Sequence, residues 1–203
     1  MAGVAVCLSE IDPPEFTMEA FVTSTLTVAL AEIGDKTQLL SLLLVARYRQ
    51  KWPIIIGILA ATLINHFISA WFGQWSASWI PADYAGIVIG VSFIAIGLWV
   101  LVPDKLDDED TRCSCYGALC ATFVLFFLAE IGDKTQVATM VLGAQYASIV
   151  WVTLGTTLGM LLANVPVVLL GEKLMRRVPL NLVRYIAAAA FMMLGLATLW
   201  WSL

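Results

Sequence analysis

A seven-residue motif with two carboxylates and one ammonium group occurs twice in this chain. It reads Glu-Ile-Gly-Asp-Lys-Thr-Gln at residues 32–38 and again at residues 130–136. Both copies lie inside hydrophobic runs, where a charged side chain at the centre of a bilayer costs about 2.5 to 3.5 kcal/mol. A buried ion pair contributes little net stability, so charges repeated together with glycine, threonine and glutamine indicate a site rather than a structural salt bridge.

The oxygen atoms of the two motifs predict a site for a hard divalent cation. The candidate ligands are Glu32, Asp35 and Gln38 from the first copy and Glu130, Asp133 and Gln136 from the second. At 100° per residue, a continuous helix would place the carboxylates and the lysine of each copy on one face. Carboxylate and amide oxygens suit Mn²⁺, Ca²⁺ or Mg²⁺ better than Zn²⁺ or Cu⁺. Mn²⁺ or Ca²⁺ is therefore the expected substrate, and no resident cofactor is expected.

The lysines and glycines of the motifs have predicted supporting roles. Lys36 and Lys134 are expected to be counter-ions that hold the empty site together and release the carboxylates when the metal arrives. Gly34 and Gly132 allow either close helix approach or a helix break that adds backbone carbonyls to the site. The first hydrophobic span, at about residues 19–46, is long for one crossing, so a break or a strong tilt is expected.

Two further pairs of polar residues complete the candidate site. Thr37 and Thr135 add hydroxyl groups to the motifs. His66 and Asn164 become equivalent when the sequence is shifted by 98 positions, and both lie well inside hydrophobic spans. Either can be a ligand or a proton relay, and the alternative is a hydrogen-bonded core residue.

The composition is that of an integral membrane protein. Of the 203 residues, 61% are hydrophobic and only 13% are charged, whereas soluble domains carry about 25% charged residues. The lipid bilayer is therefore the expected surrounding medium. No basic patch with interleaved aromatic residues is present, which excludes nucleic acid as an expected partner.

Cysteine and histidine usage argues against zinc chemistry. The chain has four cysteines, including Cys113 and Cys115, and one histidine. A structural zinc site needs four ligands with a C-x-x-C type of spacing, and a zinc protease motif needs two histidines. Ordinary reduced thiols are expected.

Hydropathy predicts an all-α integral membrane protein with six transmembrane helices. Each span is near the roughly 20 residues that cross the hydrocarbon core. The spans are expected at about residues 19–46, 53–73, 83–102, 117–143, 148–171 and 182–202.

The shift by 98 positions aligns far more than the motifs, because it also superposes Gly57 on Gly155 and Phe93 on Phe191. The chain is therefore read as two three-helix repeats, and an odd number of crossings makes them inverted. The expected parts are a flexible N-terminal extension (1–17), the first repeat (18–102), an acidic cytoplasmic linker (103–116) and the second repeat (117–203). The extension lacks the basic region of a secretory signal, and Met18 is a second candidate start.

Basic residues predict the orientation. Nine Lys and Arg residues lie outside the motifs, and all fall on one side of the predicted topology. They are Arg47, Arg49, Lys51, Lys105, Arg112, Lys173, Arg176, Arg177 and Arg184. This side is expected to be cytoplasmic, which leaves both termini extracytoplasmic.

At the two motifs, the sequence resembles a known family of small membrane proteins that carry two E-x-G-D-K/R-T/S motifs. This family includes bacterial manganese exporters and the manganese/calcium transporters of the Golgi and the chloroplast. The resemblance covers 18–203 and implies cation/proton exchange, with Glu32, Asp35, Glu130 and Asp133 at the cation site. The compact chain resembles a bacterial member, so the expected location is the bacterial inner membrane.

The sequence thus predicts a secondary transporter that exports a divalent cation from the cytoplasm in exchange for protons. A passive divalent-cation channel is the main alternative. An intramembrane aspartyl protease with Asp35 and Asp133 as a dyad is disfavoured, because a dyad does not need the additional charges of the motifs. The sequence leaves open whether one chain suffices or a homodimer forms.

Overall fold

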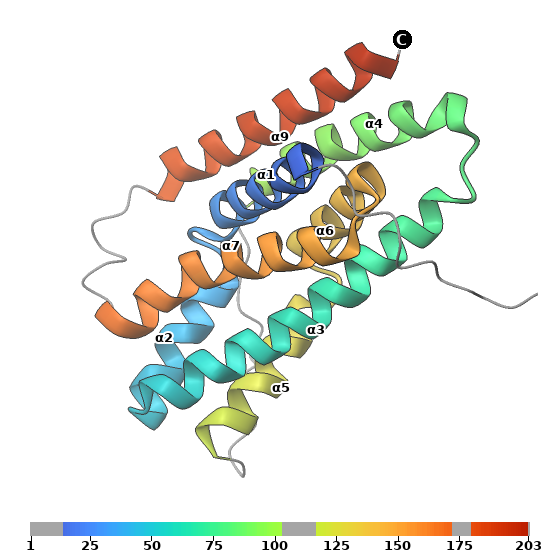
Figure 1. The fold of residues 1–203 in the computed structure, drawn as a ribbon. Coiled ribbons are helices and arrows are strands. Elements are labelled where there is room, and N and C mark those ends of the chain that lie inside the picture. Colours follow the sequence, from blue (N-terminus) through green and yellow to red (C-terminus); the bar gives the residue numbers. More distant parts are fainter. Residues whose placement is uncertain (1–13, 103–116, 172–179, 203) are drawn as a thin grey trace, which may run out of the picture.

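The computed structural model describes residues 14–102, 117–171 and 180–202, all of whose regular structure is helical (Figure 1). The linker and the extension predicted from the sequence lie largely outside these residues. The eight helices of the described part are α1 (Pro14–Glu32), α2 (Lys36–Tyr48), α3 (Lys51–Ala77), α4 (Ala82–Val100), α5 (Ala118–Glu130), α6 (Lys134–Tyr146), α7 (Ile149–Leu170) and α9 (Leu180–Ser202). Helix α1 includes the last four residues of the predicted extension.

Among the described helices, four are long and apolar enough to cross a membrane, namely α3, α4, α7 and α9. They coincide, within a few residues, with the spans expected at 53–73, 83–102, 148–171 and 182–202. The other two expected spans each consist of two shorter helices, α1 with α2 and α5 with α6. The chain is an all-helical membrane protein.

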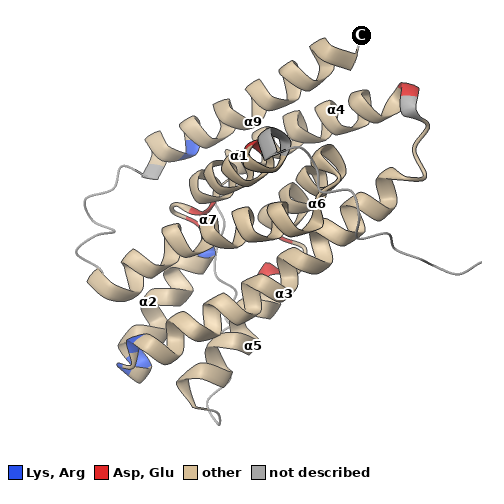
Figure 2. Cartoon of the chain, viewed as in Figure 1, with Lys and Arg blue, Asp and Glu red and all other residues tan. Residues whose placement is uncertain are grey.

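The surface of the bundle is apolar, and its interior combines apolar clusters with many buried polar residues, unlike a typical soluble protein. Large hydrophobic side chains such as Trp52, Phe67 and Trp200 are exposed. Buried polar residues include Ser24, Thr62 and the acidic residues of both motifs. Figure 2 shows that charged residues are few and gather around the two helix interruptions and near helix ends. This arrangement fits a protein surrounded by lipid that keeps a polar site inside.

The helices recur with the spacing of the sequence repeat. Helices α2 and α6 have identical lengths and begin 98 residues apart. The starts of α3 and α7 are also 98 residues apart, as are those of α4 and α9. The breaks before α2 and α6 fall at equivalent positions. The two halves of the chain are thus built from the same succession of helices.

The two halves pack crosswise. Gly155 of α7 lies against the backbone of Phe21 in α1, and Gly159, one turn later, lies against Thr25. Helices α1 and α7 therefore run parallel. In the equivalent contact, Gly57 of α3 lies against Leu119 of α5. Because glycine lacks a side chain, these helix pairs approach closely.

Helices α4 and α9, which occupy equivalent places in the two repeats, run antiparallel. Gly90 contacts Gly195, whereas Gly97, further along α4, contacts Ala188, earlier in α9. Between these contacts the rings of Phe93 and its repeat equivalent Phe191 have centroids 6.3 Å apart. A residue that contacts its own equivalent lies near the axis relating two repeats.

Candidate cation site

Each motif interrupts a helix. Helix α1 ends at Glu32 and α2 begins at Lys36, while α5 ends at Glu130 and α6 begins at Lys134. In each break the glycine has a positive φ, 86° at Gly34 and 76° at Gly132. Other residues adopt this left-handed conformation only with strain, so the glycines permit the chain to leave one helix and start the next.

The break corrects the expectation that the motif residues share one face of a continuous helix. Glu32 ends the first helix of the pair, whereas Asp35 precedes the second, because the intervening residues are not helical. In the first motif, the two carboxylates are therefore brought together by a turn. The backbone N–H of Asp35 donates to the carbonyl of Glu32 at 3.1 Å, and that of Asp133 donates to Glu130 at 3.2 Å.

The glutamines close these turns. The backbone N–H of Gly34 donates to Oε1 of Gln38 at 2.9 Å, and that of Gly132 donates to Oε1 of Gln136 at 2.7 Å. Their amide oxygens, expected as metal ligands, are thus engaged with the backbone in this structure. They fix the shape of the breaks.

The aspartates stand at helix N-termini. Asp35 is the N-cap residue of α2, and Asp133 is the N-cap residue of α6. Asp133 also accepts a hydrogen bond from the backbone N–H of Thr135 at 3.2 Å. A carboxylate is favoured there because the first N–H groups of a helix lack partners within the helix and carry partial positive charge.

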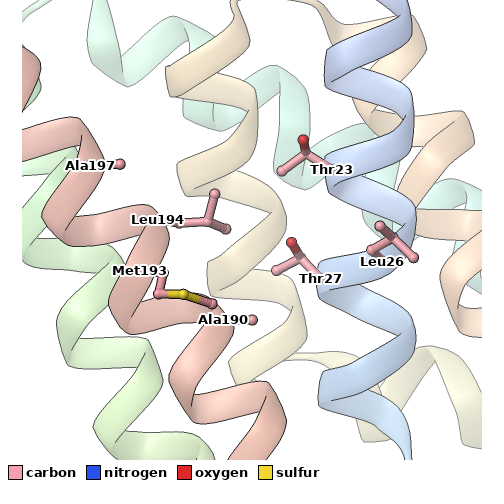
Figure 3. A pocket seen from close by; sticks show the side chains of 7 residues that line it. All are labelled: Thr23, Leu26, Thr27, Ala190, Met193, Leu194 and Ala197. Carbon is pink, nitrogen blue, oxygen red and sulfur yellow. The ribbon is translucent and has the colours of Figure 1, made fainter.

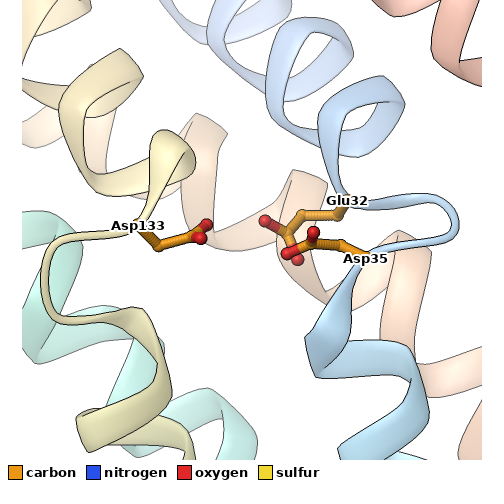
Figure 4. Close-up of side chains that lie close together, drawn as sticks. All are labelled: Glu32, Asp35 and Asp133. Atoms are coloured by element: carbon orange, nitrogen blue, oxygen red, sulfur yellow. The ribbon is translucent and has the colours of Figure 1, made fainter. Parts of the chain in front are cut away.

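Three carboxylates from the two motifs converge in the interior (Figure 4). Glu32, Asp35 and Asp133 each offer an oxygen, and these oxygens lie within 4.8 Å of one another. Figure 4 shows Glu32 and Asp35 at the two ends of the first break, with Asp133 pointing toward them from the second. All three are buried. Such a group of hard oxygen donors matches the preference of Mn²⁺, Ca²⁺ and Mg²⁺.

Two ion pairs cross between the motifs. Nζ of Lys36 lies 3.1 Å from Oδ1 of Asp133, and Nζ of Lys134 lies 2.8 Å from Oδ1 of Asp35. Each lysine thus contacts the aspartate of the other repeat, and the two pairs are equivalent under the shift of 98 residues. These ammonium groups occupy the position of counter-ions to the carboxylate group.

The two glutamates differ in their contacts. Glu32 accepts hydrogen bonds from both motif threonines, from Thr37 at 2.6 Å and from Thr135 of the other repeat. Glu130 is fully buried, yet neither of its carboxylate oxygens has a hydrogen-bond partner within the described chain. It is also absent from the group of three close carboxylates. The structure therefore brings together three of the four carboxylates expected at the site.

The equivalent residues Asn164 and His66 are both fully buried. Asn164 accepts a hydrogen bond from Ser41 Oγ at 3.0 Å and approaches Thr37 Oγ1 at 3.5 Å with its Nδ2. His66 has no hydrogen-bond partner for either ring nitrogen among the residues that the structure describes. Asn164 thus contacts the helix that follows the first motif. The sequence pointed to Asn164 only because the repeat alignment matches it with His66. Ser41 was missed because serine at a single helix position carries no signal.

A separate pocket lies between α1 and α9 (Figure 3). Its volume is about 350 Å³, and it is lined by Thr23, Leu26, Thr27, Ala190, Met193, Leu194 and Ala197. None of these side chains carries a charge, so this pocket lacks the carboxylates that a hard divalent cation prefers. The carboxylates of the motifs remain the candidate cation site.

Apolar spanning helices, two interrupted helices and buried acidic groups at the interruptions define a membrane transport protein rather than an enzyme. Comparison with known families agrees. Residues 20–108 and 118–203 match the family of the divalent cation/proton antiporter GDT1, so the chain belongs to this family.

Individual relatives extend over most of the chain. A protein of Vibrio cholerae whose name proposes that it exports manganese is 54% identical over 187 residues, which cover 92% of this chain and 93% of that protein. A GDT1-like protein of Synechocystis is 24% identical over 207 residues, covering 91% of this chain and 98% of that protein. A chloroplastic PAM71 homologue of Arabidopsis thaliana is 26% identical over 224 residues, which cover 91% of this chain and 62% of that protein. No solved structure matches the chain.

Proposed function

We propose that this protein exports Mn²⁺ from the cytoplasm in exchange for protons, with Ca²⁺ as the second candidate substrate. The observation that carries the proposal is the group of buried carboxylates of Glu32, Asp35 and Asp133, whose oxygens lie within 4.8 Å. Membership of the divalent cation/proton antiporter family supports the exchange, and the similarity to the Vibrio protein supports Mn²⁺.

The architecture we propose is six membrane spans in two inverted three-helix repeats. Helices α1 with α2 form the first span, and α5 with α6 form the fourth. The antiparallel packing of the equivalent helices α4 and α9 supports inversion, because repeats of the same orientation would give parallel equivalents. The crosswise packing of α1 on α7 and of α3 on α5 supports an axis between the repeats.

We further assign the cytoplasmic side from the basic residues. Arg47 and Lys51 flank the connection from α2 to α3, which lies toward the same end of the molecule as the start of α9 (Figure 1). Arg184 is in the first turns of α9. An excess of Lys and Arg marks the cytoplasmic side, so the C-terminus at the opposite end is extracytoplasmic, as is the N-terminus. For a bacterial member of the family, the membrane is the inner membrane.

The mechanism follows from the charges at the site. In the empty state, Lys36 and Lys134 neutralise Asp133 and Asp35. A divalent cation that binds to Glu32, Asp35 and Asp133 competes with the ammonium groups for the same oxygens. The lysines then move away from the aspartates, and the contacts between the repeats change. Cation binding is thereby linked to the relative position of the two halves.

Counting Glu130, four carboxylates and two lysines leave a charge of about −2 when all are ionised. One divalent cation or two protons restore neutrality. A neutral site crosses a low-dielectric occluded state at far lower cost than a charged one. The exchange of one Mn²⁺ for two protons therefore permits the site to change sides in either loaded form.

Transport by purified protein in proteoliposomes tests this function. Uptake of Mn²⁺, Ca²⁺, Mg²⁺ and Zn²⁺ is measured with and without an imposed pH gradient. We expect Mn²⁺ to accumulate above its external concentration when the gradient is present. Flux that only equalises the concentrations would indicate a channel, and an absence of flux for all four ions would reject the function.

A further inference from the structure

The two halves of the site have matching sequences but unequal contacts. We call the first motif together with α7 the first half of the site, and the second motif together with α3 the second half. Three positions of the first half form hydrogen bonds that their equivalents in the second half do not form within the described residues. These pairs are Glu32 with Glu130, Gln38 with Gln136 and Asn164 with His66. The inequality recurs at these three positions, although the lysine–aspartate pairs and the contacts of the glutamines with the glycines are equivalent in both halves.

In the first half, the motif helix α2 is bound to α7. Nε2 of Gln38 donates to the carbonyl of Ala163 at 2.9 Å, and Ser41 Oγ donates to Asn164 Oδ1 at 3.0 Å. Nδ2 of Asn164 also lies 3.5 Å from Thr37 Oγ1. Asn164 thus links α7 to two successive turns of α2.

In the second half, the described residues form no equivalent link between His66 of α3 and the motif helix α6. His66 occupies the place of Asn164 on α3, is fully buried, and has no partner for either ring nitrogen in the described chain. Thr135, the equivalent of Thr37, donates instead to Glu32 across the site. A buried polar group without a hydrogen bond costs about 1 to 3 kcal/mol, so such a group calls for an explanation.

We propose that His66 is a positioning residue that binds Thr135 in the opposite state of the transport cycle, as Asn164 approaches Thr37 in the state seen here. This inference rests on the proposed function and on its inverted repeats. In such a transporter, one repeat moves against the other around the fixed site, and we infer that the second repeat then takes up the contacts that the first makes here. In the state seen here, Asn164 approaches Thr37 and His66 has no partner among the described residues. In the opposite state, we expect His66 to bind Thr135 and Asn164 to be released from Thr37.

The chemistry of the two side chains fits this role. A neutral imidazole has one donor and one acceptor nitrogen, and a carboxamide likewise offers both, so either can bind a threonine hydroxyl. Helices α3 and α6 already pack closely, since Gly143 of α6 lies against Ala70, one turn after His66. A movement of α6 along or about this close contact is the change of partners that we propose. Glu130 would then accept the threonine hydroxyls that Glu32 binds here.

Two substitutions at one position separate hydrogen bonding from packing. His66→Asn reproduces the side chain of the equivalent position, whereas His66→Leu fills the space without a hydrogen bond. We expect His66→Leu to lower the maximal rate of Mn²⁺ transport in proteoliposomes about tenfold, the effect of one lost hydrogen bond. His66→Asn should stay within about threefold of the parent. Equilibrium binding of Mn²⁺ to the purified protein should change less than about threefold in both.

Three results would overturn the proposal. His66→Leu could transport Mn²⁺ as fast as the parent, or His66→Asn could be as slow as His66→Leu while both remain folded. Loss of Mn²⁺ binding in His66→Leu would instead identify His66 as a metal ligand.

A second measurement needs no transport. Leu40 of α2 is only 1% exposed and belongs to the apolar cluster that includes Val168 of α7. Leu40→Cys, in a chain whose native cysteines are serine, reports the opening of α2 from α7 by its rate of maleimide labelling. We expect Asn164→Leu to speed this labelling about tenfold and His66→Leu to slow it. Equal labelling in parent and both variants would reject the alternation, even if the parent transported no Mn²⁺.

Discussion

Lys134 of the second motif lies 2.8 Å from Asp35 of the first, and this pair is repeated in reverse by Lys36 and Asp133 at 3.1 Å. Each repeat thus supplies the counter-ion for the other. The site is held together by contacts between the repeats, and a cation that displaces them acts directly on the relative position of the two halves.

Removing any one motif carboxylate should abolish transport. We expect Glu32→Gln, Asp35→Asn, Glu130→Gln and Asp133→Asn each to lower Mn²⁺ flux at least about 100-fold, because each removes a charge needed for binding or for proton exchange. The control is Asp83→Asn, in the first turn of α4, which should transport normally. Near-parent flux in two folded variants, one from each motif, would contradict a single shared site.

Loss of a lysine should make stability depend on metal. Lys134→Met leaves Asp35 buried without this ammonium group, and breaking a buried ion pair costs about 3 to 5 kcal/mol. We expect a lower melting temperature without metal and a larger increase on adding Mn²⁺ than in the parent. The double variant Lys134→Met with Asp35→Asn should recover much of the stability but not the response to Mn²⁺. A Mn²⁺ response equal to that of the parent in Lys134→Met would argue against competition for the same carboxylate.

The left-handed glycine at the second break should be needed for stability. An added methyl group at Gly132 meets no atom within 4 Å, but φ is +76° there. Gly132→Ala should therefore cost about 1 to 2 kcal/mol through backbone strain alone. Gly117→Ala is a control with equal space and a φ of −59°, so it lacks this strain and carries only the cost of alanine at a helix N-cap. Similar melting temperatures for the two variants would show that the break does not require glycine.

The cytoplasmic linker can be tested by labelling. Cys113 and Cys115 lie in the predicted linker, and a chain with serine at the other two cysteines reports on them alone. We expect an impermeant maleimide to label them only after cells are permeabilised. Rapid labelling in intact cells would invert the topology and the assignment of the cytoplasmic side.

The sequence predicted the long apolar helices well, because hydropathy and an internal repeat are strong signals. The carboxylates proposed for the site are buried in the structure, and their role as ligands stays a prediction. The break at Gly34 was one of two predicted roles for that residue, and the positive φ explains why glycine stands there. The shared helix face of Glu32 and Asp35 was wrong because periodicity assumes an uninterrupted helix.

Other features depend on tertiary contacts that no local pattern contains. The repeat aligns Glu32 with Glu130 as equals, yet only Glu32 accepts both threonine hydroxyls. Likewise, sequence reasoning left the roles of Asn164 and His66 open, and their different partners appear only when α7 and α3 are placed beside the motif helices. A symmetric sequence cannot indicate which half is engaged in a given state.

The exchange of one divalent cation for two protons is tested most directly by separating the pH gradient from the membrane potential. Mn²⁺ flux is measured in proteoliposomes under a pH gradient, under a potassium-diffusion potential, and under both. The account predicts that flux follows the pH gradient and is nearly unaffected by the potential, because the loaded site is neutral in both directions. Flux driven strongly by the potential, or flux indifferent to pH, would contradict electroneutral cation/proton exchange at the paired motifs.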